Sequence, residues 1–320
     1  MKHGLLCGWN DLDIGLIQVD LSDAQVAGKQ IPYSGKRVNR PLPSGPHHRP
    51  HMPGDQSSGV SLSKNECFPA TQKQPRPASA SASFNASSSQ SLCTMEDTYR
   101  ALSERLRAKW AEKKALGQAR LVVAIAGPPG SGKSTMASKV VEHVARSDNA
   151  PSIVAVSADG FHLSRRALRA LPNAQHALAR RGAPWTFDGE AAAELACRLR
   201  TEAGRRAVSA PTFDHALKDP VQNGVTIAPE TEICIFEGNY LLSDEAPWST
   251  IGDVVDDRWL VSVDVEVAKR RLAARHLDAG IEGSMEDAVA RAESNDLVNG
   301  EYVMAHSFGR HDVLIDSAEE

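Results

Sequence analysis

At residues 127–134 the chain reads Gly127-Pro128-Pro129-Gly130-Ser131-Gly132-Lys133-Ser134. This stretch matches the phosphate-binding pattern G-x-x-x-x-G-K-[ST]. An apolar, strand-like run at 121–126 precedes it, and a helical pattern at 134–146 follows it. Because the pattern binds nucleotides in this strand–loop–helix context, the stretch predicts a nucleotide-binding loop and a P-loop NTPase fold.

The residue types in this loop suit a nucleoside triphosphate. The glycines let backbone N–H groups point at phosphate oxygens, and the helix that follows adds the positive end of its dipole. We expect Lys133 to reach the β and γ phosphates, the Ser134 hydroxyl to bind Mg²⁺, and Thr135 to contact the α phosphate. All residues from Gly127 to Thr135 are therefore predicted to bind nucleotide, with ATP and Mg²⁺ as cofactors.

Around the loop, short apolar runs alternate with helical patterns. Short β-branched runs between helices predict an α/β fold with a doubly wound, mainly parallel sheet and helices on both faces. Thr94, with Asp97 three residues later, is predicted to cap a first helix that ends at Gly117. The expected strands are 121–126, 153–157, 233–236, 260–263 and 313–315, and the further expected helices are 134–146, 164–171, 189–200, 267–279 and 284–295.

The first 94 residues differ in composition from the rest. They hold nine of the 18 prolines, and residues 56–94 hold eleven serines, without a sustained hydrophobic period. Such a composition is typical of disorder, so we expect a disordered Ser/Pro-rich extension at 1–94 and a single P-loop kinase domain at 95–320. Two alternatives stay open for the extension, a dispensable tail with Met95 as the functional start or a regulatory or docking tail.

Composition and charge argue against several classes of protein. No run approaches the roughly 18 apolar residues of a membrane helix, and the five cysteines lack metal-ligand spacing, so we expect a cytoplasmic protein with no membrane partner. Residues 95–320 hold 27 Lys and Arg against 34 Asp and Glu, a net charge of −7, which argues against a nucleic-acid partner. A homodimer is compatible with the sequence.

Two carboxylates follow apolar strands of the expected sheet. Asp159 comes just after the run 153–157, and Glu237 closes the run 233–236. Ligands of open α/β sheets bind at the carboxyl ends of the strands. We therefore expect Asp159 to accept the proton of an acceptor hydroxyl and Glu237 to hold Mg²⁺ through water. The alternatives are an aspartate that caps a turn and a glutamate that faces solvent.

The helix expected at 267–279 has a basic face, with Arg271 and Arg275 at positions i and i+4. Such a face can close over ATP as a lid and neutralise the charge that develops on the transferred phosphoryl group. The alternative for each arginine is a solvated helix surface.

The residues between 157 and 233 form an insertion in which acceptor recognition is expected. It carries His162, Arg165 and the stretch Pro211-Thr212-Phe213-Asp214-His215. Basic residues here suggest an acceptor with anionic or polar groups, although basic residues on a short helix are as often there for solubility.

Several reactions remain compatible with a phosphate loop. The guanine-reading motif N-K-x-D and the signature L-S-G-G-Q are absent, which removes the main support for a GTPase or an ABC-type ATPase. A kinase needs an acceptor-facing carboxylate, a Mg²⁺ anchor and mobile arginines, and the chain has residues for all three. We expect an ATP- and Mg²⁺-dependent kinase that phosphorylates a hydroxyl of a small metabolite, of the sugar, nucleoside or vitamin-precursor type. The rival is a P-loop ATPase with a regulatory or binding role, for which the acceptor is water.

Taken together, the motifs resemble those of the phosphoribulokinase/uridine kinase family, over about residues 100–320. The chain looks closest to a nucleoside/nucleotide kinase-like branch with fungal ATP-dependent kinases and bacterial fructose-transport kinases, and more distantly resembles pantothenate and uridine kinases. The motifs shared with the family are 127–134, 159–162, 211–215, 236–240 and 271–275, and those shared with the branch are 181–184, Trp248 and Asn295-Asp296-x-x-Asn299.

The resemblance implies roles for individual residues. Asp159 takes the position of the base, Glu237 that of the Mg²⁺ anchor, and Arg271 and Arg275 those of the lid arginines. His215 resembles the substrate-facing histidine of bacterial pantothenate kinase, and His162, Arg165 and Tyr240 of the motif 236–240 are expected beside the acceptor. Phe213 stands where pantothenate kinase has an aromatic hydroxyl, so a pantothenate contact is missing.

Overall fold

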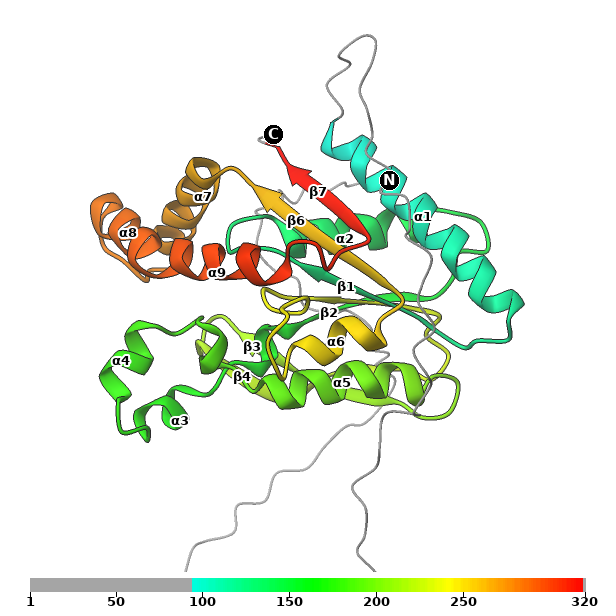
Figure 1. Cartoon of the computed structure of the whole chain (residues 1–320), viewed down its shortest axis with the longest axis horizontal. Helices are drawn as coiled ribbons and strands as arrows, with labels where there is room; N and C mark the ends of the chain where they lie inside the picture. Colours follow the sequence, from blue (N-terminus) through cyan, green and yellow to red (C-terminus); the bar gives the residue numbers. More distant parts are fainter. Residues whose placement is uncertain (1–93, 319–320) are drawn as a thin grey trace, which may run out of the picture. The chain divides into compact units, whose positions relative to one another are not determined.

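Five parallel strands form the central sheet of the protein. The computed structural model describes residues 94–318, and in it the strand order is β2-β5-β1-β6-β7 (Figure 1). The doubly wound parallel α/β architecture predicted from the sequence is therefore confirmed. The strands are β1 (Leu121–Ala126), β2 (Ile153–Ser157), β5 (Ile233–Glu237), β6 (Asp257–Val263) and β7 (Val313–Ser317).

The register of the three strands β2, β5 and β1 determines where the functional residues gather. Glu237, the last residue of β5, pairs with Ile125 of β1 on one side and with Ser157 of β2 on the other. All three strands run in the same direction, so their carboxyl ends meet at one edge of the sheet. The phosphate loop, the Asp159 turn and Glu237 all lie at this edge.

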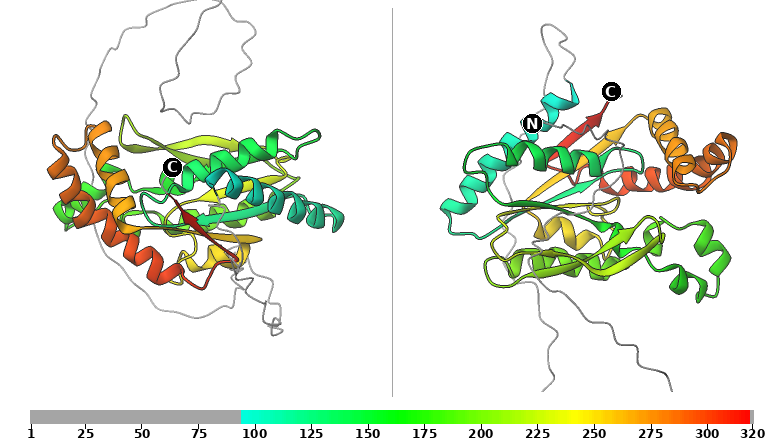
Figure 2. Two further views of the ribbon diagram at one scale, coloured as in Figure 1. Left: turned by 90° about the horizontal axis from the view of Figure 1, so that it is seen from above. Right: turned by 180° about the vertical axis from the view of Figure 1, so that it is seen from behind.

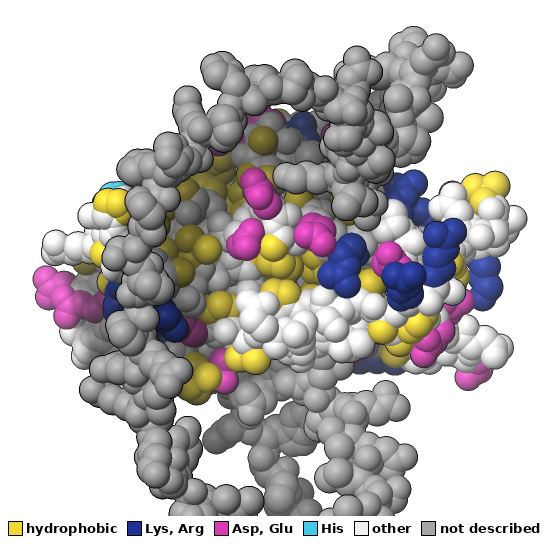
Figure 3. All heavy atoms as spheres, turned by 90° about the horizontal axis from the view of Figure 1, so that it is seen from below, with side chains coloured by type: hydrophobic (Ala, Val, Ile, Leu, Met, Phe, Trp, Pro, Cys, Tyr) yellow, Lys and Arg dark blue, Asp and Glu magenta, His cyan; other side chains and the backbone are white. Residues whose placement is uncertain are grey.

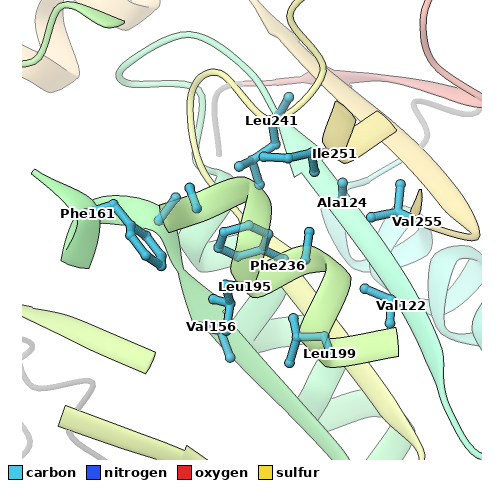
Figure 4. Packing of buried hydrophobic residues seen from close by; sticks show 14 of the residues in the cluster. Val122, Ala124, Val156, Phe161, Leu195, Leu199, Phe236, Leu241, Ile251 and Val255 are labelled. Atoms are coloured by element: carbon cyan, nitrogen blue, oxygen red, sulfur yellow. The ribbon is translucent and has the colours of Figure 1, made fainter. Parts of the chain in front are cut away.

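Helices cover both faces of the sheet, because alternate strand residues are buried on opposite sides. Val123 and Ile125 pack under α1 (Met95–Ala115) and α2 (Lys133–Ala145), whereas Val122 and Ala124 pack with α5 (Gly189–Thr201) and α6 (Ser249–Val254). Figure 2 shows this layering from two further directions. Figure 4 shows the second layer, in which side chains of α5 and α6 meet the strand residues Val122, Ala124 and Phe236.

An antiparallel hairpin that the sequence did not predict lies beside this second layer. It consists of β3 (Val208–Asp214) and β4 (Asp219–Ile227), with an irregular register between Ala210 and Thr212. Proline is tolerated in a strand at such an irregularity. Pro211 therefore argued against a strand in the sequence, although the strand forms. Gly160 lies directly against the hairpin, because a Cβ atom there would stand 2.2 Å from the Pro211 carbonyl oxygen.

The helices that follow β6 form a separate layer at the edge of the sheet that carries the phosphate loop. Buried Ala268 and Leu272 of α7 (Val265–Asp278), the helix predicted to act as a lid, pack with Ala292, which begins a widened π-helical turn. The sequence predicted a single helix at 284–295, but the chain continues through this turn into α9. The elements of this layer are α7 (Val265–Asp278), α8 (Met285–Arg291), the π turn η3 (Ala292–Asp296) and α9 (Leu297–Ser307).

The first helix begins where the sequence predicted. Thr94 and Asp97 form the expected capping box at the start of α1. The expected disorder of the N-terminal extension concerns residues outside the described part of the chain. The insertion also contributes short helical elements, which are η1 (Ala158–Phe161), α3 (Arg165–Arg169), α4 (Ala174–Ala179) and η2 (Pro184–Thr186).

Two further features are the hydropathy of the helices and the charge of one face. Among residues 94–318, no helix is both long enough and apolar enough to cross a bilayer. Seen from below in Figure 3, the molecule shows acidic and basic side chains on the same face, with apolar side chains between them. This face therefore carries charges of both signs.

Candidate active site

The phosphate loop has the backbone conformation that its glycines allow. Gly130 and Gly132 have φ angles of +78° and +82°, in the left-handed region that other residues rarely adopt. Helix α2 begins directly afterwards at Lys133, and Ser134 and Thr135 are exposed in its first turn. The loop therefore presents the free N–H groups and the positive dipole end of a helix to a phosphate.

Lys133 is held in the interior of this loop. Its Nζ donates to the carbonyl oxygen of Pro128 at 2.9 Å. Burial lowers the pKa of Lys133 to about 8, although the negative charges of Glu237 and Asp159 act in the opposite direction. In the free protein, the Lys133 ammonium group is therefore desolvated and hydrogen-bonded to a neutral carbonyl oxygen. A bound phosphate would place a negative charge beside it.

This environment predicts how ATP binding depends on pH. ATP binds the protonated form of Lys133, so its affinity should be highest below pH 8 and fall by about tenfold per pH unit above the pKa of the free protein. Titration of ATP against the wild-type protein between pH 7 and 10 measures this. The variant Lys133→Arg stays charged throughout that range and should show no inflection. An inflection that persists in Lys133→Arg would mean that another group is responsible.

Glu237 and Ser134 meet at the carboxyl edge of the sheet. The Ser134 hydroxyl donates to Glu237 Oε1 at 3.1 Å, and Glu237 is only 4% exposed. Burial raises the pKa of Glu237, and nearby Asp159 raises it further. Ser157, the register partner of Glu237 on β2, lowers this pKa, a neighbour that sequence reasoning missed.

The hydroxyl and the carboxylate together suit a magnesium ion. Mg²⁺ bound to a nucleotide takes few protein ligands and keeps several waters. Residues 94–318 contain no group of three or more His, Cys, Asp or Glu side chains placed to hold a metal by themselves. Ser134 would bind the ion directly and Glu237 through water, and the cation would offset the cost of burying that carboxylate.

Asp159 lies in the one-turn helix η1, directly after β2. Its backbone N–H donates to the Ser157 hydroxyl at 3.3 Å, which caps the turn. The Asp159 side chain is 46% exposed, and its charge acts on both Lys133 and Glu237. The carboxylate therefore lies near Lys133 and Glu237 and stays about half exposed.

His162 is packed beside Asp159 rather than directed freely into the site. Its ring lies between Phe187 and Phe213, with centroid distances of 3.9 and 5.1 Å. Its Nδ1 lies 2.8 Å from the carbonyl oxygen of Asp159, and since a carbonyl can only accept, this nitrogen carries a proton. Burial lowers the pKa of His162, so the ring is neutral near pH 7.

Two further residues predicted to bind the acceptor lie near the end of the hairpin. His215 is exposed just after β3, and its charge acts on His162. The backbone N–H of Arg165 donates to Asp219 at the start of β4, at 2.8 Å. The structure thus brings His215 and Arg165 to the side of Asp159 that carries His162.

The two arginines of the predicted lid lie on the face of α7 that turns toward the phosphate loop. Arg271 donates to the carbonyl oxygen of Gly130 at 3.3 Å and to the Ser317 hydroxyl at 3.0 Å. Arg275 is exposed, and its charge acts on Lys133. Arg271 is therefore already in contact with the loop, whereas Arg275 has room to move onto a phosphate.

Tyr240 is placed differently from the other predicted acceptor residues. It is only 1% exposed, and its hydroxyl donates to the carbonyl oxygen of Gly182 at 2.5 Å. Its ring packs against Phe187 and Trp248. In this arrangement Tyr240 supports the wall of the site, and its hydroxyl is already engaged.

A groove of about 590 Å³ lies next to this aromatic layer. Four aromatic side chains line this groove, together with Leu163, the residue that follows His162. Its volume matches that of small-molecule sites. The lining aromatic residues are Trp185, Phe187, Trp248 and Tyr302.

Comparisons with known proteins show which family the chain resembles. Residues 122–289 match the model of the phosphoribulokinase/uridine kinase family. A Schizosaccharomyces pombe protein described as a candidate uridine kinase is 38% identical over 186 residues, which are 58% of this chain and 79% of that protein. An ATP-dependent kinase-like protein of Aspergillus versicolor is 43% identical over 148 residues, 46% of this chain and 86% of that one.

A solved structure agrees as well. A candidate fructose transport system kinase from Silicibacter has a TM-score of 0.58 and 30% identity, and the match covers 68% of this chain and 98% of that one. The residues matched by the family model contain the phosphate loop, Asp159, Glu237 and both lid arginines.

Proposed function

The chain belongs to the phosphoribulokinase/uridine kinase family of P-loop kinases, which use ATP, and we propose that it transfers the γ-phosphate of ATP to a hydroxyl group of a small metabolite, with Mg²⁺ as cofactor. One observation carries this proposal. A half-exposed carboxylate, Asp159, lies at the same sheet edge as Lys133 and Glu237 and is open toward the insertion. A site for hydrolysis alone would not need a carboxylate directed at an insertion with its own groove.

In the proposed reaction, the acceptor oxygen attacks the γ-phosphorus while the bond between that phosphorus and the β–γ bridging oxygen breaks. Asp159 accepts the proton of the acceptor hydroxyl, and ADP leaves with the electron pair of the broken bond. Lys133 and the lid arginines stabilise the negative charge on the transferred group. When bound, Mg²⁺ would neutralise charge on the β and γ phosphates.

The acceptor would bind between η1, the hairpin and residues 180–187. Asp159 meets its hydroxyl, Arg165 supplies positive charge nearby, and His215 lies exposed just after β3. The adjacent groove has room for the body of a small molecule. These features support a metabolite as the acceptor and leave its identity to experiment.

A screen for acceptor-stimulated ADP release tests the proposal. The purified protein is incubated with Mg²⁺, ATP and pools of sugars, nucleosides, vitamin precursors and hydroxy acids. We expect one pool to raise the rate of ADP release well above the rate in its absence. Equal rates with every pool and without any would favour the rival ATPase function.

The role proposed for Glu237 predicts a changed metal requirement. Glu237→Gln removes the charge that would hold the Mg²⁺ waters, so the Mg²⁺ concentration for half-maximal activity should rise by about 10- to 100-fold. Glu232→Gln is a matched control, because Glu232 directly precedes the same strand at its opposite end and pairs with Lys114. A shift of equal size in both variants would argue against a metal role for Glu237.

A further inference from the structure

Two buried asparagines connect the helices that follow β6 with the insertion between β2 and β5. Asn295 lies in the π turn and Asn299 in the first turn of α9, and they are only 5% and 2% exposed. Burying an amide is costly unless it is hydrogen-bonded. The partners of both side chains lie at residues 180–181, more than a hundred positions earlier in the chain.

Four hydrogen bonds cross this junction, the longest of them from Arg180 Nη1 to the carbonyl oxygen of Asn295 at 3.4 Å. Asn299 Oδ1 accepts from Arg180 Nη2 at 2.9 Å, and Arg180 Nη1 donates to the carbonyl oxygen of Ser294 at 2.9 Å. Asn295 Nδ2 donates to the carbonyl oxygen of Arg181 at 3.0 Å. Both the side chain of Arg180 and the backbone of Arg181 are therefore tied to this part of the chain. In Figure 1, α9 lies above the segment that carries α3 and α4.

The next residue of α9 lies against the phosphate loop. A Cβ atom at Gly300 would stand 3.1 Å from Cβ of Pro128 and 3.8 Å from Cδ of Pro129. Glycine thus lets the backbone of the helix approach the loop closely. Two consecutive residues, Asn299 and Gly300, contact the two sides of the reaction site.

The segment 180–187 in turn holds the residues next to the proposed base. The side chain of Arg181 donates to the carbonyl oxygen of Leu163 at 3.1 Å and to Asp219 of the hairpin at 2.9 Å. Phe187 packs on the ring of His162, whose Nδ1 contacts the Asp159 carbonyl. Continuous contacts therefore lead from the phosphate loop through α9 to the side of the site where the acceptor would bind.

We propose that Asn295 and Asn299 are positioning residues, which hold the segment 180–187 at a fixed distance from the phosphate loop and so align acceptor and donor. The proposal rests on the proposed kinase function, since phosphoryl transfer requires the two substrates in line. A displacement of about 1 Å between reacting groups can cost about 10²-fold in rate. A buried hydrogen-bonded junction between the two walls would prevent such a displacement.

Amide hydrogen exchange tests this junction without an identified acceptor. The probe is Mg²⁺ with a non-hydrolysable ATP analogue, added to the full chain. The reporting amides are those of Gly182, Ala183 and Thr186, which are hydrogen-bonded within the segment. In the wild type, the analogue should slow their exchange by about fivefold or more through α9.

Two variants separate positioning from simple stability. Asn299→Leu keeps the approximate volume but removes the acceptor for Arg180, so the nucleotide-dependent slowing should be lost while analogue affinity stays within about threefold. Asn299→Asp keeps the acceptor oxygen and should retain the slowing. Should Asn299→Leu fail to fold, Arg180→Leu removes the same hydrogen bond from the other partner.

Each other outcome overturns the proposal. Slowing that persists in Asn299→Leu or in Arg180→Leu would contradict the positioning role proposed for Asn299, because both variants remove its hydrogen bond to Arg180. If the wild type binds the analogue but amide exchange at residues 182–186 is not slowed, the junction does not couple the two sides. The proposed kinase function would not be affected by that result. A wild type that does not bind the analogue in direct titration would contradict the proposed function as well.

Discussion

Replacing Lys133 with alanine is expected to abolish phosphoryl transfer, with a loss of about 10³-fold or more in turnover. Lys133 Nζ is the buried positive charge of the loop, held by the Pro128 carbonyl beside the phosphate site. Among the described residues, the neighbouring cations Arg271 and Arg275 come from the lid and approach the loop from outside. They cannot take the place of a charge held between the β and γ phosphates. ATP binding should weaken in the same variant.

The matched control for this substitution is Lys139→Ala on the same helix. The Lys139 side chain is 45% exposed and pairs with Glu142 of α2, away from the loop. Turnover should remain close to that of the wild type. If Lys133→Ala retained wild-type turnover, the assignment of this loop as the donor site would be wrong.

Replacing Asp159 with asparagine should lower the acceptor-dependent rate by about 10²- to 10⁴-fold, the usual contribution of a positioned general base. Asparagine keeps the shape of the side chain and removes the proton acceptor. The loop and Glu237 are unchanged, so binding of ATP and Mg²⁺ should survive. The KM for the acceptor should change less than kcat, because the loss falls mainly on the transition state.

Asp148→Asn provides the control for Asp159→Asn. Asp148 is exposed in the turn that precedes β2, whereas Asp159 follows that strand, so only Asp159 lies at the carboxyl edge of the sheet. Normal turnover in Asp159→Asn, with an essential His162, would move the base assignment to the histidine. The packing of the His162 ring against Phe187 and Phe213, with Nδ1 on the Asp159 carbonyl, argues against that outcome.

Much of the sheet could be predicted from the sequence, because its strands are short apolar runs and the central strands β1 and β5 are buried along their whole length. β1 and β2 have the predicted bounds, since runs such as Leu121–Ala126 are apolar without interruption. The hairpin was missed because Pro211 interrupts β3 and because the exposed middle of β4 shows no alternation. The helix α9 was missed because Asn299 and Gly300 weaken its helical pattern.

The candidate site divides in the same way. The phosphate loop could be found because its residues are contiguous and their spacing has a direct chemical meaning. Ser134 and Glu237, 103 positions apart, could be expected together because both were predicted to bind Mg²⁺. The hydrogen bonds of Arg180 with Asn299 and of Arg181 with Asn295, which span 119 and 114 positions, could not. Such pairs form only when the sheet and the lid layer are assembled, and a single sequence contains no local signal for them.

The fate of the γ-phosphate is the most direct test of the proposed transfer to a hydroxyl group. ATP labelled in the γ-phosphate is incubated with the wild-type protein, Mg²⁺ and the acceptor pools, and the products are separated. We predict that the label appears in a phosphate ester of one acceptor, one for each ADP formed, and that Lys133→Ala and Asp159→Asn form little or none. Label recovered only as inorganic phosphate, at a rate that no acceptor changes, would contradict the account.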